Sequence, residues 1–304
     1  MTNKRAKRPV NERIDQLLNM AWNTKSTART LAIVNQILEI APDNVDALVI
    51  KADNTQDADE RTEILMHALE ALDTSGITDP DEKEILSFVV NQRLAFTFFY
   101  SNKFEEALRF CEAALKSEAV RLDPEAEAGE KDMKSLYYRL LIECGEWQKI
   151  LAETMRDEEH SWAWGYSRLI AAWMLAQDNT RYVCANMFWD VLAMSPDIPF
   201  YMLGYFAEPD DGASQEEHEE FDFALLYYDA LSVSDDFFNW FTRGTILFGL
   251  LSGRFEERER EYLLDVLDTL GGYEEYERMS GRIIEGDDAA VIEMLAANKC
   301  LTTE

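Results

Sequence analysis

The chain has few of the residues that interrupt helices, since glycine occurs 13 times and proline 7 times among its 304 residues. This scarcity suits many helices joined by short turns. Valine and threonine rarely follow the alternating pattern of strands, whereas alanine, leucine, glutamate and methionine recur at helical spacing almost from end to end. A hydrophobic content of 47% excludes disorder. The sequence therefore predicts an all-α fold.

Long apolar runs are missing as well. The longest candidate, 244–253, is half the roughly 20 residues that span a bilayer, so we expect no membrane segment. No apolar signal core follows the basic start, which favours a cytoplasmic location. Cysteines lie far apart without a CxxC pair, at Cys111, Cys144, Cys184 and Cys300. In a cytoplasmic protein such residues are expected to be small buried side chains and not disulfides or metal ligands.

Cations are scarce relative to anions, and the formal net charge is −30 with a pI near 4.4. Such a charge opposes direct binding to nucleic acid or to an anionic membrane. The exception is residues 1–13, which we interpret as a basic N-terminal tail, either a solvated terminus or a docking segment. Its cations are Lys4, Arg5, Lys7, Arg8 and Arg13, against the single acid Glu12.

Lysine and arginine are absent altogether between Arg181 and Arg243, where thirteen acidic residues occur. Carboxylates at that density repel one another, and a basic partner or a cation would relieve the repulsion. The alternative is that the acidic residues serve solubility alone. Both interpretations stay open at the level of sequence.

Catalytic and cofactor motifs are missing too. The chain has no glycine-rich phosphate loop, HExxH, GxSxG or cysteine pair at metal spacing. The chain has three histidines, His67, His160 and His218. They lie far apart in the sequence, so the sequence gives no reason to expect a shared site. A loose Ca²⁺ contact within 210–222 is conceivable, but the EF-hand ligand spacing is absent. We therefore expect no enzymatic activity, no cofactor and no metal site.

Helical hairpins are the clearest pattern in the sequence. Large and small apolar residues alternate at helical spacing on both sides of a polar turn at 101–103, and Ala107 and Ala114 allow two helices to approach closely. A second hairpin spans 136–150 with its turn at 145–147. A third turns at 177–179 and closes at Pro196, and further hairpins are indicated near 33–72 and 245–255.

Ala95, Phe104, Ala107 and Ala114 match the spacing of the tetratricopeptide repeat, and the chain resembles that family over five or six degenerate units. The resemblance implies a right-handed superhelical solenoid of antiparallel helix pairs. Residues 197–203 also resemble the suppressor-of-tumorigenicity family of repeat proteins, which implies no activity. Asp265 and Asp268 depart from the pattern, which indicates a degenerate last unit or a cap.

Residues 207–220 interrupt the repeated pattern of helical hairpins. Pro209, Asp210, Asp211 and Gly212 are turn-forming residues, and four glutamates follow them at a helix start. The expected organisation is therefore a basic tail at 1–13, TPR-like repeats at 14–206, an acidic loop insertion at 207–220, and C-terminal repeats with a cap at 221–304.

Aromatic residues cover more than one helix face in several segments, among them 237–241. They pack between repeats, or they line the concave groove that first helices form in the tetratricopeptide family. The resemblance places the following residues in that groove: Gln92, Phe96, Phe99, Arg139, Tyr166, Leu169, Trp173, Trp240 and Arg243. The acidic residues expected to contact a partner are Glu216, Glu217, Glu219 and Glu220.

These features predict a protein interaction scaffold that binds a basic or mixed basic-apolar protein segment through an aromatic groove and an acidic surface. An alternative is an acidic inhibitor that imitates nucleic acid and blocks a DNA- or RNA-handling protein. Neither the partner nor the oligomeric state follows from the sequence.

Overall fold

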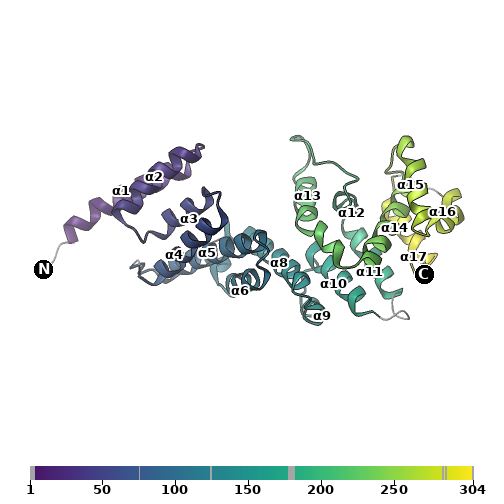
Figure 1. Ribbon diagram of the computed structural model, residues 1–304, viewed down its shortest axis with the longest axis horizontal. Helices are drawn as coiled ribbons and strands as arrows, with labels where there is room; N and C mark the ends of the chain where they lie inside the picture. The colour runs from purple at the N-terminus through teal and green to yellow at the C-terminus, as the bar shows by residue number, and fades with distance from the viewer. Residues whose placement is uncertain are drawn as a thin grey trace. The chain divides into compact units, whose positions relative to one another are not determined.

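The computed structural model describes residues 4–74, 76–123, 125–176, 182–282, 284 and 286–302. Every regular element in these residues is a helix, which confirms the predicted all-α class (Figure 1). None of the helices in these ranges combines the length and the apolar character that crossing a bilayer requires. The chain forms two compact units, Met1–Leu140 and Leu141–Glu304.

Unit 1 contains helices that follow one another closely. They are α1 (Lys4–Trp22), α2 (Thr27–Ile40), α3 (Val45–Asp53), α4 (Ala58–Thr74), α5 (Pro80–Tyr100), α6 (Phe104–Leu115), α7 (Ala119–Leu122) and the first part of α8 (Glu125–Glu143). From α1 to α6 each helix contacts the next one in sequence. Residues 4–13, expected to be a tail, belong to α1.

The core of unit 1 follows the predicted spacing. Ile33, Val34 and Ile37 of α2 pack with Ala47 and Ile50 of α3, and all five are buried. The side chain of Asn44 accepts a hydrogen bond from Ala47 N at 2.9 Å and so caps the start of α3, within the hairpin region predicted at 33–72. Ala107 and Ala114 are buried, as their small size at a helix crossing requires.

A common turn ends several helices. Asn102, Gly145 and Gly253 each adopt a left-handed conformation, with φ of 56°, 68° and 74°. In each case the next backbone N–H reaches back five residues, as from Lys103 N to Phe98 O at 2.9 Å. This is the Schellman arrangement, which satisfies carbonyls that the helix end leaves without partners. The predicted polar turns at 101–103 and 145–147 are thus confirmed. The predicted turn at 177–179 lies outside the described residues.

Unit 2 begins at Leu141 and holds the remaining helices. They are α9 (Trp147–Thr154), α10 (Trp162–Leu175), α11 (Tyr182–Met194), α12 (Ile198–Met202), α13 (Gln215–Tyr227), η2 (Tyr228–Val233), α14 (Asp235–Ser252), α15 (Glu257–Thr269), α16 (Tyr273–Met279), η3 (Ser280–Arg282) and α17 (Asp288–Ala297). Residues 207–214, the greater part of the predicted acidic insertion, precede α13 without regular structure.

Helix α14 is the centre of unit 2. Its residues from Gly244 to Ser252 are all buried. A helix that packs on one side only would expose some of them, so this part of α14 is covered on all sides. Helix α17 returns from the end of the chain and contacts both α11 and α14. Phe248 and Gly249 face α12 and the α14–α15 turn, where a β-carbon on Gly249 would lie 2.8 Å from Phe200 and 2.4 Å from Phe255. Unit 2 therefore closes around α14 through contacts between segments distant in sequence.

Candidate functional site

The aromatic residues predicted for a groove in unit 2 belong to its core. Tyr166, Leu169, Trp173 and Trp240 are at most 9% exposed. The prediction that they line an open groove is wrong for these four residues. Their burial agrees instead with the alternative that the aromatic residues pack between helices.

Ring contacts explain this burial. The ring of Tyr166 lies 5.6 Å from that of Phe223, and the ring of Trp173 lies 4.8 Å from that of Trp240 and 5.6 Å from that of Phe237. These contacts join α10 to α13 and α14. Large aromatic side chains on more than one face of α10 and α14 are buried because other helices cover each of those faces.

The predicted groove residues of unit 1 are also largely enclosed. Gln92 and Arg139 are buried, and Phe96 and Phe99 are half-buried. Gln92 Oε1 accepts a hydrogen bond from Arg93 Nη1 at 2.8 Å, and the Arg139 guanidinium lies over the Phe99 ring at 5.8 Å. These polar side chains are engaged with their own unit and do not stand open to a partner.

Arg243, the last of the predicted groove residues, is half-buried in unit 2. Its Nε lies 4.0 Å from Glu275 Oε2. The two side chains are each 12% exposed, so the ion pair joins α14 to α16 below the surface. Arg243 therefore stabilises contacts within unit 2 instead of facing a groove.

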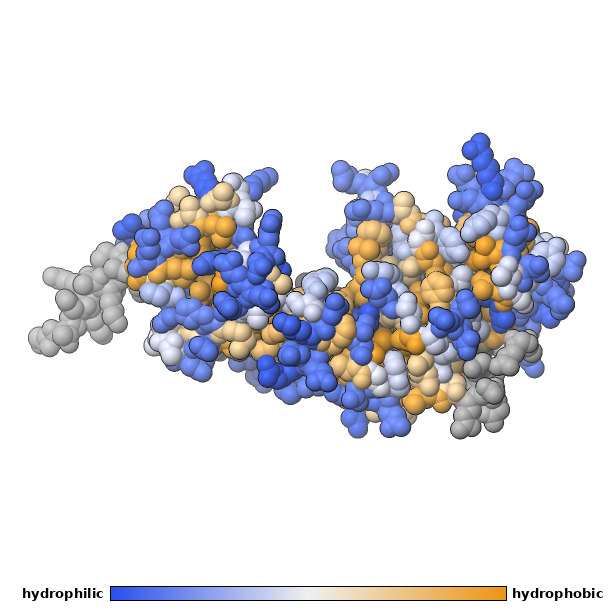
Figure 2. All heavy atoms as spheres, viewed as in Figure 1, coloured by the Kyte–Doolittle hydropathy of each residue, from blue (hydrophilic) through white to orange (hydrophobic). Residues whose placement is uncertain are grey.

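Three of the exposed apolar side chains of unit 2 lie on successive elements of the chain. Leu225 of α13, Tyr228 of η2 and Phe238 of α14 are 54%, 50% and 41% exposed. Helix α13 and α14 both contact η2. We call the exposed side chains of 222–238 the α13–α14 face. Figure 2 shows that apolar side chains reach the surface of unit 2 between hydrophilic ones.

Carboxylates accompany these apolar side chains. Asp222, Asp229, Asp235 and Asp236 are exposed, and none of them has an ion-pair partner within the described ranges. The absence of lysine and arginine from 182–242 explains this, because the sequence supplies no nearby cation. The α13–α14 face therefore combines apolar area with uncompensated negative charge.

The start of α13 is fixed by a capping box. Ser214 Oγ accepts a hydrogen bond from Glu217 N at 3.2 Å, and Glu217 Oε2 accepts one from Ser214 N at 2.8 Å. Hydrogen bonding of the Glu217 carboxylate to the backbone N–H of Ser214, and then to its hydroxyl, lowers the pKa of Glu217. Glu216 and Glu219 are exposed beside it, as predicted for acidic surface residues. Sequence and structure agree on this helix start.

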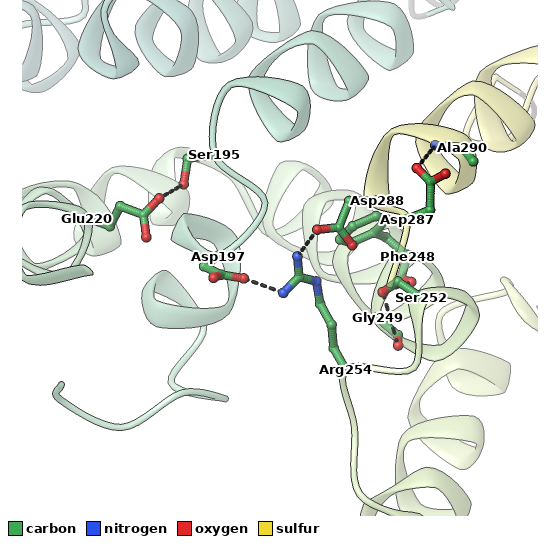
Figure 3. Close-up of polar contacts among 10 residues, drawn as sticks. All are labelled: Ser195, Asp197, Glu220, Phe248, Gly249, Ser252, Arg254, Asp287, Asp288 and Ala290. Carbon is green, nitrogen blue, oxygen red and sulfur yellow. Dashed lines mark hydrogen bonds and ion pairs between the residues drawn. The ribbon is translucent and has the colours of Figure 1, made fainter. Parts of the chain in front are cut away.

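Glu220 differs from the other three predicted glutamates, because it is buried. Ser195 Oγ donates a hydrogen bond to Glu220 Oε1 (Figure 3). Burial raises the pKa of Glu220, and the negative charges of Asp197, Glu216 and Glu217 raise it further, while the Ser195 hydrogen bond opposes the shift. The prediction that Glu220 contacts a partner directly is wrong, since its carboxylate holds α13 against the segment that precedes α12.

A second polar cluster includes Asp197, two residues after Ser195. The Arg254 guanidinium binds Asp197 through Nη1 and Asp288 through Nη2 (Figure 3). It also lies over the rings of Phe200 and Phe248, at 5.5 and 5.3 Å. Burial raises the pKa of Asp197 although Arg254 opposes the shift. This cluster joins the start of α12, the α14–α15 turn and the first turn of α17.

The Ser195–Glu220 hydrogen bond holds the first part of α13, and the Arg254 cluster joins the ends of α12, α14 and α17. Within the described ranges, no group of three or more histidine, cysteine or carboxylate side chains is arranged to hold a metal ion. Comparison of the chain with protein-family models, curated proteins and solved structures gives no match. The exposed face is therefore the feature on which a functional argument depends.

The sequence pattern indicates the surplus of acidic residues in 182–242 but not the α13–α14 face itself. The acidic contact residues that it predicts, Glu216, Glu217, Glu219 and Glu220, precede this face, and it does not distinguish Leu225, Tyr228 and Phe238 from buried residues. The helical spacing of Leu225 and Tyr228 was the signal that could have predicted their exposure. Leu225 and Tyr228 lie one helical turn apart and follow Asp222, whereas the buried residues Phe223, Ala224 and Tyr227 occupy the other side of the same turns.

Proposed function

We propose that this protein is an interaction scaffold whose unit 2 binds a basic or mixed basic-apolar segment of another protein. The observation that carries the proposal is the α13–α14 face, where exposed apolar side chains alternate with carboxylates that have no ion-pair partner among the residues described. This surface takes the place of the groove expected from the sequence.

Physical chemistry supports a partner of that composition. Bringing lysine or arginine to uncompensated carboxylates removes mutual repulsion and speeds association. Burying large apolar side chains contributes to affinity, at roughly 25 cal/mol per Å² removed from water. A purely basic partner would use only the first effect, and a purely apolar one only the second. A segment that combines both properties fits the face best.

We further propose that the framework is a TPR-like array of antiparallel helix pairs in the cytoplasm. Consecutive contacts from α1 to α6 and the Schellman turns after α5, α8 and α14 support this architecture. The packing of α17 on α11 and α14 indicates that the array ends in a closed cap. Scaffolds of this kind present side chains from several helices on one rigid surface.

Binding of a fluorescent amphipathic peptide of leucine and lysine tests the proposal, with anisotropy measured from low to physiological salt. We expect saturable binding that weakens as salt rises. A polylysine of the same charge should bind more weakly, because it lacks apolar side chains. Equal binding of both peptides would favour the nucleic-acid mimic, in which charge alone acts. No binding of either peptide would overturn the proposed function.

A matched control separates a defined site from general acidity. Helix α15 carries the exposed residues Glu257, Glu261, Asp265 and Tyr262, which offer similar charge beside an exposed aromatic ring. Neutralising Asp222, Asp229 and Asp235 to asparagine should weaken peptide binding, whereas Glu257→Gln, Glu261→Gln and Asp265→Asn together should change it little. Equal losses in both variants would show that net charge, and not this face, binds the peptide.

A further inference from the structure

The α13–α14 face also indicates the conformation of its partner. We infer that the bound segment is an amphipathic α-helix with an apolar stripe and lysine or arginine along its edge. This inference rests on the proposed function and adds to it the form of the ligand. It depends on three observations: the backbone pairing of the face, the spacing of its side chains and its rigidity.

Backbone pairing argues against an extended ligand. The described residues contain no strand, and α13 and α14 satisfy their interior backbone groups within each helix. An extended peptide on such a surface finds no row of backbone donors and acceptors to pair with. A helix brings its own backbone hydrogen bonds and needs only side-chain contacts. The surface therefore suits a helical ligand.

Side-chain spacing provides the second argument. Tyr228 follows Leu225 by three positions, and Phe238 is an exposed apolar residue in the first turn of α14, the helix that follows η2. Apolar residues at i, i+3 or i+4, and i+7 of a ligand helix form a stripe that matches such an area. Asp222 precedes Leu225 by three residues, and Asp235 precedes Phe238 by three. Cations beside the ligand stripe would meet these carboxylates.

Rigidity is the third argument. Two of the exposed apolar residues follow a large buried one: Tyr227 precedes Tyr228, and Phe237 precedes Phe238. The Tyr227 hydroxyl is hydrogen-bonded to Ser167 Oγ at 3.0 Å, and Ser234 Oγ accepts from Phe237 N at 3.1 Å. A face held in place in this way loses little conformational freedom on binding. The ordering cost then falls mainly on the ligand.

The test uses the full chain, two peptides of identical composition and a stapled derivative of the first peptide. The first has leucines at helical spacing with lysines alongside, the second has the same residues in scrambled order, and the third is the first peptide with a hydrocarbon staple opposite its apolar stripe. We expect the first peptide to bind at least tenfold tighter than the scrambled one. The stapled helix should bind tighter still, because it is already helical and loses less conformational entropy on binding.

Variants of the protein locate the site. The triple substitution Leu225→Ser, Tyr228→Ser and Phe238→Ser should weaken binding of the stapled peptide at least tenfold, whereas Tyr262→Ser on α15 should change it less than twofold. These side chains are exposed, so thermal unfolding should be nearly unchanged and serves as the folding control.

The outcomes distinguish the two proposals. If the charge variant loses binding but the scrambled peptide binds as well as the helical one, the helix inference is overturned and the proposed function survives. If the apolar triple variant binds normally, the apolar side chains of the face are not used and both proposals are overturned. If no peptide binds the wild-type chain, both are overturned.

Discussion

Trp240 Nε1 donates a hydrogen bond to the backbone carbonyl of Leu301 at 3.2 Å, which joins the middle of α14 to the end of the described chain. Leu301 N in turn donates to Glu275 Oε1 at 3.0 Å, and the Leu301 side chain is 3% exposed. Cys300 and Leu301, which follow α17, are therefore part of the core of unit 2. Their removal should affect α14 directly.

Shortening Leu301 to alanine should destabilise unit 2. The Leu301 side chain fills space beside Gly244, where an added β-carbon would lie 2.7 Å from Leu301 Cδ1. The substitution leaves a cavity next to α14, and we expect a loss of about 2–4 kcal/mol in the free energy of unfolding. Chemical denaturation measures this, and the exposed Leu225→Ala serves as the control, with a change below about 0.5 kcal/mol. Equal stability of both variants would contradict the packing described.

Adding a methyl group at Gly249 should also be unfavourable. Its β-carbon would lie 2.4 Å from Phe255 Cε2 and 2.8 Å from Phe200 Cε1, so both rings must move. We expect Gly249→Ala to lower the free energy of unfolding by about 1–3 kcal/mol, because overpacking outweighs the better helix propensity of alanine. Gly212→Ala is the matched control, since nothing lies within 4 Å of its β-carbon position. An unchanged melting temperature for Gly249→Ala would argue against this contact.

Glu220 should make stability depend on pH. Its pKa is raised above the ordinary value of 4.5 by burial, so the folded state binds a proton more tightly than the unfolded state. Stability should therefore rise as the pH falls from neutral towards 4.5, and the ionised form should cost stability at neutral pH. Asp197, whose pKa is also raised, contributes in the same direction.

Replacing Glu220 with glutamine separates its part of this dependence. Glutamine still accepts the Ser195 hydrogen bond but carries no charge, so Glu220→Gln should be more stable than wild type at pH 7 and less sensitive to pH between 7 and 4.5. Denaturation at several pH values measures the slope. The exposed Glu219→Gln should keep the wild-type slope, and a Glu220→Gln slope identical to that of wild type would refute the assignment.

Removing the positive charge of Arg254 should destabilise unit 2, because two carboxylates depend on it. Arg254→Met leaves Asp197 and Asp288 without their cation, and their side chains are each 34% exposed. We expect a loss of about 2 kcal/mol, less than for fully buried pairs because water reaches both carboxylates. Adding Asp197→Asn and Asp288→Asn to Arg254→Met removes the unpaired charges and should recover part of the stability. A triple variant less stable than the single one would show that packing, not charge, explains the loss.

The local pattern of the sequence predicted the helices well, and particular residues show why. Alternation of large and small apolar residues specified α5 and α6, on either side of the polar turn at 101–103. The capping residues before α13 were likewise visible as turn and helix-start chemistry. These features depend on neighbours within a few residues, so the chain itself contains the information.

Whether an aromatic side chain is buried or exposed could not be predicted from the local sequence pattern. Trp173 and Trp240 have the same character in a groove as in a core, and only the helix that packs against them distinguishes the two environments. The return of α17 onto α11 and α14 brings residues near 300 into contact with those near 240. No periodicity over a few turns reports a contact of that separation.

The sequence by itself determined the all-helical class, the turns at 101–103 and 145–147 and the concentration of acidic charge in 182–242, because each follows from local propensity or composition. Only the tertiary structure decided that Glu220 is buried while Glu219 is exposed, and that Leu225, Tyr228 and Phe238 remain at the surface while Tyr166 and Trp173 do not. The physical reason is that burial depends on which helices cover a residue, and that is fixed by packing between segments far apart in the chain.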